Sequence, residues 1–211
     1  MIASDSFWDK AADKYARKSV GDEAAYAKTL ERTVQHLSPD QHALEIGCGT
    51  GTTALKLAPH VAHITGIDIS ERMIEIARNK ASDQGIQNVT FAHSPHDTFI
   101  AQQGAQSFDV VMAFNVLHLL DEPAKTVRSL RMLLKSDGLF ISKTPCLGEM
   151  TKLLRPLVWG MQKLGKAPLV HYINYVTLDD MIRDAGFDII ASGIYPAKTR
   201  SRLIIAKRRQ A

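Results

Sequence analysis

The stretch ALEIGCGTG, residues 43–51, decides the fold class of this chain. An apolar run of strand length leads into three alternating glycines, Gly47, Gly49 and Gly51, and a helical segment follows. Glycine adopts positive φ without strain and lets a ligand approach the backbone closely. The free amides at the start of the following helix favour an anionic or carboxylate group. We therefore expect a strand–loop–helix unit that binds a small ligand.

The glycine spacing limits which ligand this loop can hold. The dinucleotide-binding pattern GxGxxG needs glycine at position 52, where the chain has Thr52, and the Gly-Lys-Ser/Thr ending of a phosphate-binding loop is absent. Glu45 would repel a pyrophosphate, whereas it suits a ligand that carries an ammonium group. A tight turn without a ligand is the alternative, although such a turn needs only one glycine.

Strand-length apolar runs alternate with segments of helical period along the chain. We expect Ser70 to cap one helix, and Thr177 to precede another with Asp180 three residues on. The alternation predicts an α/β fold whose parallel sheet is covered by helices on both faces. The last two strands are too close in sequence for a helical crossover, so they should form an antiparallel hairpin. The predicted strands are 42–46, 63–68, 88–93, 108–114, 138–143, 187–194 and 202–207, and the predicted helices are 22–37, 71–84, 121–134 and 178–185.

Composition and charge narrow the class of protein. The 211 residues are 45% hydrophobic and 23% charged, which is typical of a globular domain and excludes a disordered or fibrous chain. Two cysteines, Cys48 and Cys146, cannot form a disulfide framework, so we expect a reducing, cytoplasmic location. No apolar run has the length of a membrane span, and the first residues lack the pattern of a secretory signal.

The net charge of +4 is unevenly distributed. Residues 150–178 contain four basic residues and no acid, and residues 189–211 contain six and no acid. The rest of the chain has 16 basic residues against 22 acids, a net charge of −6. An acidic body argues against a nucleic-acid partner. We expect Lys207, Arg208 and Arg209 to form a solvated tail at the edge opposite the active site.

Asp68 ends the predicted strand 63–68, in the sequence GIDIS. An acid in this place can accept hydrogen bonds from both ribose hydroxyls of a nucleoside that lies over the sheet. Capping of the next helix is the alternative, but Ser70 is available for that task. Ile69 and Met73 could flank an adenine ring or belong to the core.

Four stretches together resemble the class I S-adenosylmethionine-dependent methyltransferases, above all the small-molecule branch that includes the quinone-biosynthesis type. They are LEIGCGTG, GIDIS, FDVVMAFNVLHLL and LRMLLKSDGLFIS. The resemblance covers roughly residues 7–143 and, in element order, the final strands. It implies a Rossmann-like, seven-stranded, mostly parallel sheet in the order 3-2-1-4-5-7-6 with the last strand antiparallel. It also implies a single domain over residues 1–211 and S-adenosyl-L-methionine as the cofactor.

The resemblance further implies which residues surround this cofactor. The glycines would line its methionine portion, Glu45 would lie near its ammonium group, Asp68 would bind the ribose, and Asn115 would offer polar atoms near the methionine end. Helices within residues 1–38 would cover the cofactor, with Tyr15 either closing over it or packing the first helix onto the body. The full set is Tyr15, Glu45, Gly47, Cys48, Gly49, Gly51, Asp68, Ile69, Met73, Ser94, His96 and Asn115.

One part of the chain departs from the family pattern. The acid that the family has just after the third strand falls on Pro95 here, within HSPHD at 93–97. Ser94, the His96 amide or Asp97 could instead recognise the adenine amino group. The HxxH spacing of this segment, and that of His60 with His63, suggests a metal pair. Neither pair has the third ligand that a metal site needs, so we expect no metal.

Methyl transfer from a sulfonium is an in-line displacement, so the enzyme mainly aligns the reactants and excludes water. A base is needed only for a protonated acceptor, and His118 is the candidate, with a packed, hydrogen-bonded histidine as the alternative. The segment 145–176 follows the fifth strand and should form a lid, because ligands bind at the carboxyl edge of such sheets. We expect His171, Tyr172 and Tyr175 to contact the acceptor.

Basic residues of the predicted lid and of the final hairpin would surround the mouth of the acceptor site. They predict an apolar acceptor with an anionic group, or an acceptor presented at an anionic membrane surface. A solvated basic face is the alternative. The residues are Lys152, Arg155, Lys163, Lys166, Lys198 and Arg200.

The sequence thus predicts an S-adenosylmethionine-dependent methyltransferase that acts on a small organic acceptor. Three rival functions stay open: a non-catalytic S-adenosylmethionine-binding protein, an RNA or protein methyltransferase, and a nicotinamide oxidoreductase. The residues at 114–117, FNVL, lack an Asn-Pro-Pro-Tyr signature, which argues against methylation of amino groups in DNA bases.

Overall fold

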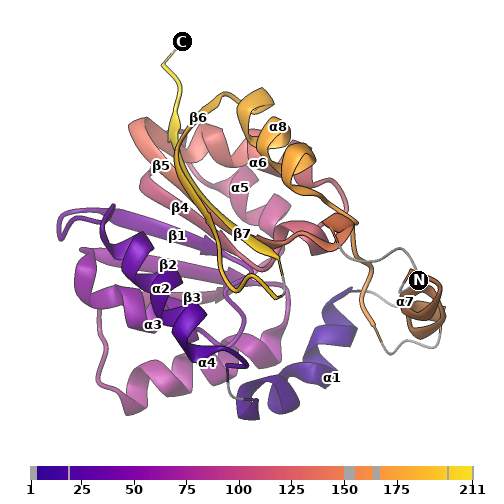
Figure 1. Cartoon of the computed structure of the whole chain (residues 1–211). Helices are drawn as coiled ribbons and strands as arrows, with labels where there is room; N and C mark the ends of the chain where they lie inside the picture. The colour runs from indigo at the N-terminus through magenta and orange to yellow at the C-terminus, as the bar shows by residue number, and fades with distance from the viewer. Residues whose placement is uncertain (1–3, 19, 150–154, 164–166, 199, 211) are drawn as a thin grey trace.

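The computed structural model of the chain describes residues 4–18, 20–149, 155–163, 167–198 and 200–210. A seven-stranded sheet crosses the molecule in the order β3-β2-β1-β4-β5-β7-β6 (Figure 1). The strands from β3 to β5 pair in parallel, and β7 is antiparallel to both β5 and β6, which confirms the predicted order and the hairpin. The strands are β1 (His42–Ile46), β2 (His63–Asp68), β3 (Val89–His93), β4 (Phe108–Phe114), β5 (Leu134–Pro145), β6 (Phe187–Ile194) and β7 (Ser201–Arg208).

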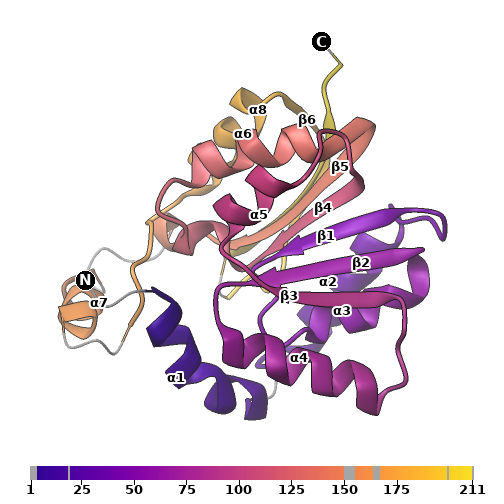
Figure 2. The same ribbon diagram turned by 180° about the vertical axis from the view of Figure 1, so that it is seen from behind.

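Helices cover both faces of the sheet (Figure 2). Apolar side chains of α5, α6 and α8 pack on one face, and those of α2, α3 and α4 pack on the other. The helices are α1 (Ser4–Arg17), α2 (Glu23–Val34), α3 (Thr52–Leu57), α4 (Glu71–Asp83), α5 (His96–Gln102), α6 (Pro123–Leu133), α7 (Arg155–Lys163) and α8 (Tyr175–Asp184), with the short 3₁₀ helices η1 (Ala58–His60), η2 (Leu117–Leu119) and η3 (Leu147–Glu149).

Strand β4 lies at the centre of the sheet and explains why its sequence has no polar alternation. Val111 and Ala113 belong to the core on one face, whereas Val110, Met112 and Phe114 belong to the core on the other. Each of these side chains is buried. A parallel strand with both faces covered needs this continuous apolar run.

The helix starts agree with the sequence at Ser70 and differ at two other places. The Ser70 hydroxyl accepts from the Met73 amide at 3.1 Å and caps α4, as predicted. Helix α6 begins at Pro123, two residues after the predicted start at 121, with the proline in its first turn. The prediction that α8 begins after Thr177 was wrong. The helix starts at Tyr175, because the Asn174 side chain accepts from the Thr177 amide at 2.8 Å and caps it earlier.

The fifth strand and the C-terminal end also required correction. Strand β5 starts at Leu134 instead of residue 138, since Leu134 pairs with Phe108 and its carbonyl accepts from the Arg208 guanidinium. The last basic residues are therefore not a solvated tail. Lys207 forms an ion pair with Asp137, and Arg209 pairs with an aspartate of β6. They do lie at the edge of the sheet opposite the carboxyl ends of the parallel strands, as expected.

The aromatic contact between β5 and β6 should dominate the stability of the antiparallel half of the sheet. Phe140 and Phe187 are fully buried and stack with ring centroids 5.3 Å apart. We expect Phe140→Ala to lower the free energy of unfolding by about 3–5 kcal/mol, because it leaves a cavity in the core. Urea unfolding followed by circular dichroism measures this change.

Ile190→Ala is the matched control, since Ile190 lies on β6 but is half exposed. We expect it to change the free energy of unfolding by at most about 0.5 kcal/mol. Equal losses of unfolding free energy in the two variants would contradict a dominant contribution of the Phe140–Phe187 contact to stability.

Candidate cofactor site

The loop after β1 carries the backbone conformation that its glycines predicted. Gly47 and Gly49 have φ of 63° and 53°. A Cβ at Gly47 would lie 2.5 Å from a methyl group of Val116, so only glycine fits there. A Cβ at Gly49 would meet only the Tyr15 ring, at 4.0 Å. The loop therefore approaches its neighbours closely at Gly47 and leaves open space above Gly49.

Asp68 ties this loop to the start of α4. One carboxylate oxygen accepts from the Gly49 amide at 2.9 Å, and the other accepts from the Ser70 amide at 2.9 Å. Burial raises the pKa of Asp68, and the two amide hydrogen bonds oppose that rise. The sequence had suggested Asp68 only as a ribose ligand or a helix cap, and its link to Gly49 was not foreseen.

Glu45 lies beneath the glycine loop on β1 and is only 2% exposed. Its Oε2 has no hydrogen-bond partner, and the Ala54 backbone in the first turn of α3 partly opposes the effect of burial on its pKa. Burial, with a further contribution from Asp68, raises the pKa of Glu45 to about 8. A buried carboxyl group with an open acceptor atom is prepared to stabilise a nearby cation.

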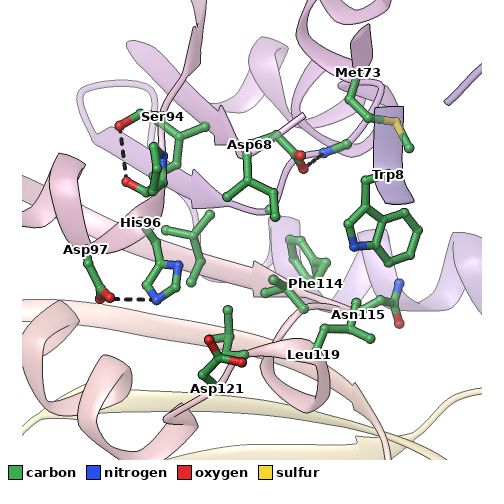
Figure 3. Close-up of a pocket in the computed structure, with 18 of the residues that line it drawn as sticks. Trp8, Asp68, Met73, Ser94, His96, Asp97, Phe114, Asn115, Leu119 and Asp121 are labelled. Carbon is green, nitrogen blue, oxygen red and sulfur yellow. Dashed lines mark hydrogen bonds and ion pairs between the residues drawn. The ribbon is translucent and has the colours of Figure 1, made fainter. Parts of the chain in front are cut away.

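A cavity of about 320 Å³ opens above the glycine loop at the carboxyl edge of the sheet. Figure 3 shows Trp8 and Met73 on one side of it, His96 with Asp97 on the other, and Asp68 between them. The full lining is Trp8, Tyr15, Ile46, Gly47, Gly49, Ile67, Asp68, Ile69, Met73, Ser94, Pro95, His96, Asp97, Phe114, Asn115, Val116, Leu119, Leu120 and Asp121.

Helix α1 covers one side of the cavity and is held by α4. Asp9 accepts from the Ser70 hydroxyl at 2.6 Å and from the Arg72 amide at 3.2 Å, at the amino end of α4. Arg72 also forms an ion pair with Asp13 at 2.9 Å. The carboxylate of Asp9 complements the positive end of the α4 dipole. These contacts bring Trp8 and Tyr15 over the glycine loop.

The structure brings most of the predicted cofactor residues together around the cavity, namely Tyr15, Gly47, Gly49, Asp68, Ile69, Met73, Ser94, His96 and Asn115. Glu45, Cys48 and Gly51 do not line it. The Cys48 side chain is buried, and a Cβ at Gly51 would lie 2.6 Å from the ring of Phe91. Gly51 is therefore needed where the loop packs on its neighbours.

The predicted base His118 is nine-tenths buried and does not line the cavity. Its carbonyl accepts from the His171 amide at 2.7 Å, which joins the loop after β4 to the segment before α8. His118 Nδ1 and His171 Nε2 are both buried without a hydrogen-bond partner. Burial, and to a smaller degree His171, lowers the pKa of His118 to about 4. His118 is therefore uncharged near neutral pH.

The other acceptor and rim residues that the structure describes also lie outside the lining. The Tyr175 ring stands 5.7 Å from the guanidinium of Arg202, and Tyr172 lies in the stretch that precedes α8. Lys163, Lys198 and Arg200 are exposed. Lys152 and Lys166 lie outside the described residues, as does the side chain of Arg155. A basic rim around the acceptor site therefore stays a prediction.

The histidine pairs that suggested a metal have protein partners. His63 Nε2 lies 3.0 Å from the Thr90 hydroxyl, and His93 Nε2 lies 3.0 Å from the Ile69 carbonyl. Across the described ranges, no group of three or more histidine, cysteine or acidic residues could hold a metal ion. None of the described helices has both the length and the apolar composition that crossing a bilayer requires.

Trp8 and Asp121 are among the lining residues that the sequence analysis missed, although a signal existed for Trp8. Trp8 precedes Tyr15 by seven residues, two helical turns, so both side chains share one face of α1. Their rings meet edge to face with centroids 6.5 Å apart. Asp121 had been interpreted as part of a helix start. Because α6 begins at Pro123, Asp121 precedes the helix and faces the cavity.

Comparison with known proteins identifies the family. A model of a methyltransferase domain matches residues 37–171. The chain is 32% identical over 114 residues to the uncharacterized methyltransferase YcgJ of Bacillus subtilis, covering 54% of this chain and 42% of that protein. It is 34% identical over 103 residues to a ubiquinone biosynthesis O-methyltransferase of Coxiella burnetii, covering 48% of this chain and 43% of that protein. The matches thus span about two fifths of the length of these curated relatives.

Solved structures show the same fold. The magnesium protoporphyrin IX methyltransferase of Synechocystis with bound SAH superposes with a TM-score of 0.74 at 22% identity, covering 98% of each chain. The family model, the sheet order and the glycine loop agree. The chain therefore belongs to the class I S-adenosylmethionine-dependent methyltransferases.

The cavity fits the cofactor of this family. S-adenosylmethionine carries a sulfonium and an ammonium, and the cavity is lined by Asp68, Asp97 and Asp121 with Glu45 beneath it. The described lining contains no lysine or arginine. Open space above Gly49 lets a ligand approach the backbone. Acidic groups in a lining that contains no lysine or arginine are suited to a cation.

Glu45 should make the stability of the free protein depend on pH. The unfolded chain loses the Glu45 proton near pH 4.5, whereas the folded protein keeps it to about pH 8. Stability is therefore lost as the pH rises between these values. We expect Glu45→Gln, which cannot ionise, to be more stable than the unsubstituted protein at pH 9 and to show no such loss.

Thermal unfolding of both proteins from pH 5 to pH 9 measures this difference. Glu75→Gln serves as the control, because Glu75 is an exposed partner of Arg72. If the melting temperatures of Glu45→Gln and the unsubstituted protein differ by the same amount at every pH in this range, the buried, protonated state of Glu45 is contradicted.

Proposed function

We propose that this chain transfers the methyl group of S-adenosylmethionine to a small, apolar organic acceptor. The observation that carries the proposal is the cavity above the glycine loop, which combines open backbone at Gly49, three carboxylates and apolar side chains. Membership of the methyltransferase family supports it. The activity is stated as a proposal because the matches cover only about two fifths of the length of the curated relatives.

The cofactor would lie across the carboxyl ends of three adjacent strands. Its methionine portion would occupy the space over Gly47 and Gly49 after β1, with Glu45 close to the ammonium. Its ribose would lie at Asp68 after β2. Its adenine would extend between Met73 and the segment after β3, in line with the sheet order β3-β2-β1. Asn115, after β4, would border the methionine end.

When bound, the sulfonium supplies an electrophilic methyl group together with a good leaving group. The chain then has to align the acceptor with that methyl group and exclude water. Trp8 and Tyr15 on α1 cover the cavity and serve this purpose. Residues 1–38 and 145–176 are proposed as the two covers of the site, the first over the cofactor and the second over the acceptor.

The apolar part of the lining argues for an apolar acceptor. Trp8, Phe114, Leu119 and Leu120 offer hydrophobic surface, and the described lining has no cation for an anionic group. Two relatives are named for ubiquinone biosynthesis and for magnesium protoporphyrin IX, which supports a small-molecule acceptor. His118 as a base, and the contacts of His171, Tyr172 and Tyr175 with the acceptor, belong to this proposal.

Gly49→Ala tests the cofactor site, with Gly85→Ala as a matched control. Both glycines have positive φ and free space for a Cβ, so both variants should pay a similar backbone strain of about 1–2 kcal/mol. Only the Gly49 methyl group would enter the cavity. We expect at least about a tenfold loss of S-adenosylmethionine affinity for Gly49→Ala and none for Gly85→Ala, measured by calorimetry.

Equal affinities in these two variants would refute the site. Calorimetric binding of NAD without binding of S-adenosylmethionine would favour an oxidoreductase. Binding of the cofactor without formation of S-adenosylhomocysteine from any apolar acceptor pool would favour the non-catalytic rival.

Cofactor affinity should rise with pH because Glu45 is protonated in the free protein below about pH 8. A bound ammonium favours the ionised carboxylate, so binding would release a proton. We expect affinity to increase about tenfold per pH unit from pH 6 and to level off near pH 8. Glu45→Gln should remove this dependence. A flat profile in the unsubstituted protein would contradict a direct role of Glu45.

A further inference from the structure

The imidazole of His96 lies in the cavity at the end farthest from the glycine loop along the sheet order. His96 is the first residue of α5, directly after the segment that follows β3. Its Nε2 lies 3.2 Å from Asp97 Oδ1 and 3.2 Å from the Thr126 hydroxyl. Thr126 is buried on α6, a separate element of the fold. Both contacts are made at Nε2, one from α5 and one from α6.

These contacts select one form of the ring. The Asp97 carboxylate can only accept, so its charge beside Nε2 favours the neutral tautomer that carries the proton on Nε2. Nδ1 is then an acceptor with a free lone pair. Figure 3 shows Nε2 directed toward Asp97 and the opposite side of the ring turned toward the cavity. An acceptor nitrogen thus faces the ligand space.

We propose that His96 reads the adenine of the cofactor, with Nδ1 accepting a hydrogen bond from the exocyclic amino group, and that Asp97 and Thr126 are positioning residues. This inference rests on the proposed function and gives it a determinant of base specificity. The order β3-β2-β1 supports it, since a ribose at Asp68 and a methionine portion at Gly49 leave the base at the end of β3.

The sequence left open which group contacts the adenine amino group, because Pro95 stands where the family has an acid. The proposed role of His96 answers this question. Pro95 lines the cavity but has no side-chain polar atom. The Ser94 hydroxyl donates to the Pro95 carbonyl at 3.1 Å. Asp97 is mostly exposed, and its carboxylate faces the His96 ring. Of these neighbours, His96 has the acceptor atom that is both inside the cavity and fixed in orientation.

The test compares S-adenosylhomocysteine with its 6-desamino analogue, in which hydrogen replaces the amino group. A neutral hydrogen bond of about 1 kcal/mol corresponds to roughly a fivefold preference for the amino compound. We expect this preference in the unsubstituted protein and its loss in His96→Leu. Both dissociation constants are measured by calorimetry, so the ratio does not depend on catalytic activity.

His93→Leu is the matched control. His93 is exposed, contacts the Ile69 carbonyl and does not line the cavity, so the preference should be unchanged. Thr126→Val should reduce the preference for S-adenosylhomocysteine over its 6-desamino analogue. Thr126→Ser, which keeps the hydroxyl group, should retain this preference. A merely structural role of Thr126 would lower the melting temperature without changing the ratio of the two constants.

A second measurement determines which nitrogen of the His96 ring carries the proton. Nitrogen chemical shifts of His96 in the free protein should show protonated Nε2 and unprotonated Nδ1. A proton on Nδ1 would overturn the proposal, as would an unchanged preference in His96→Leu. If the unsubstituted protein binds neither compound, the proposed cofactor site itself fails. If it binds both equally, only the role of His96 fails.

Discussion

The carboxylate of Asp68 is the interaction on which the site depends. Its two oxygens accept from the amides of Gly49 and Ser70, and so fix the loop after β1 against the start of α4. Ser70 in turn caps α4 and donates to Asp9 on α1. One partly buried acid therefore connects the glycine loop, the helix that packs beneath it and the helix that covers the cavity.

Placing a second acid, Glu45, under the same loop has an energetic cost for the free protein. Burial and the proximity of Asp68 disfavour its ionised form, and Oε2 has no partner. Such a group lowers stability at high pH, and a cationic ligand would offset that loss. The described lining of the cavity shows the same excess of negative charge, since it contains Asp68, Asp97 and Asp121 but no lysine or arginine.

The sequence predicted the fold well where local pattern and tertiary structure agree. The glycine loop, the continuous apolar run of β4 and the Ser70 cap each have one physical reason, and each was found. The sequence failed where distant residues decide. Strand β5 extends to Leu134 because Phe108 and Arg208 bind its polar-looking start. The spacing of Trp8 and Tyr15 places both on one face of α1, but only the fold brings Trp8 and Asp121 to the cavity. The inward-facing ring of His96 likewise depends on Thr126, thirty residues away.

A structure with bound S-adenosylhomocysteine tests the central claim most directly. The account predicts the amino-acid portion over Gly47 and Gly49, the ribose hydroxyls on the Asp68 carboxylate, and the base between Met73 and His96. The product bound in another cavity, or bound here with its ribose away from Asp68, would contradict it.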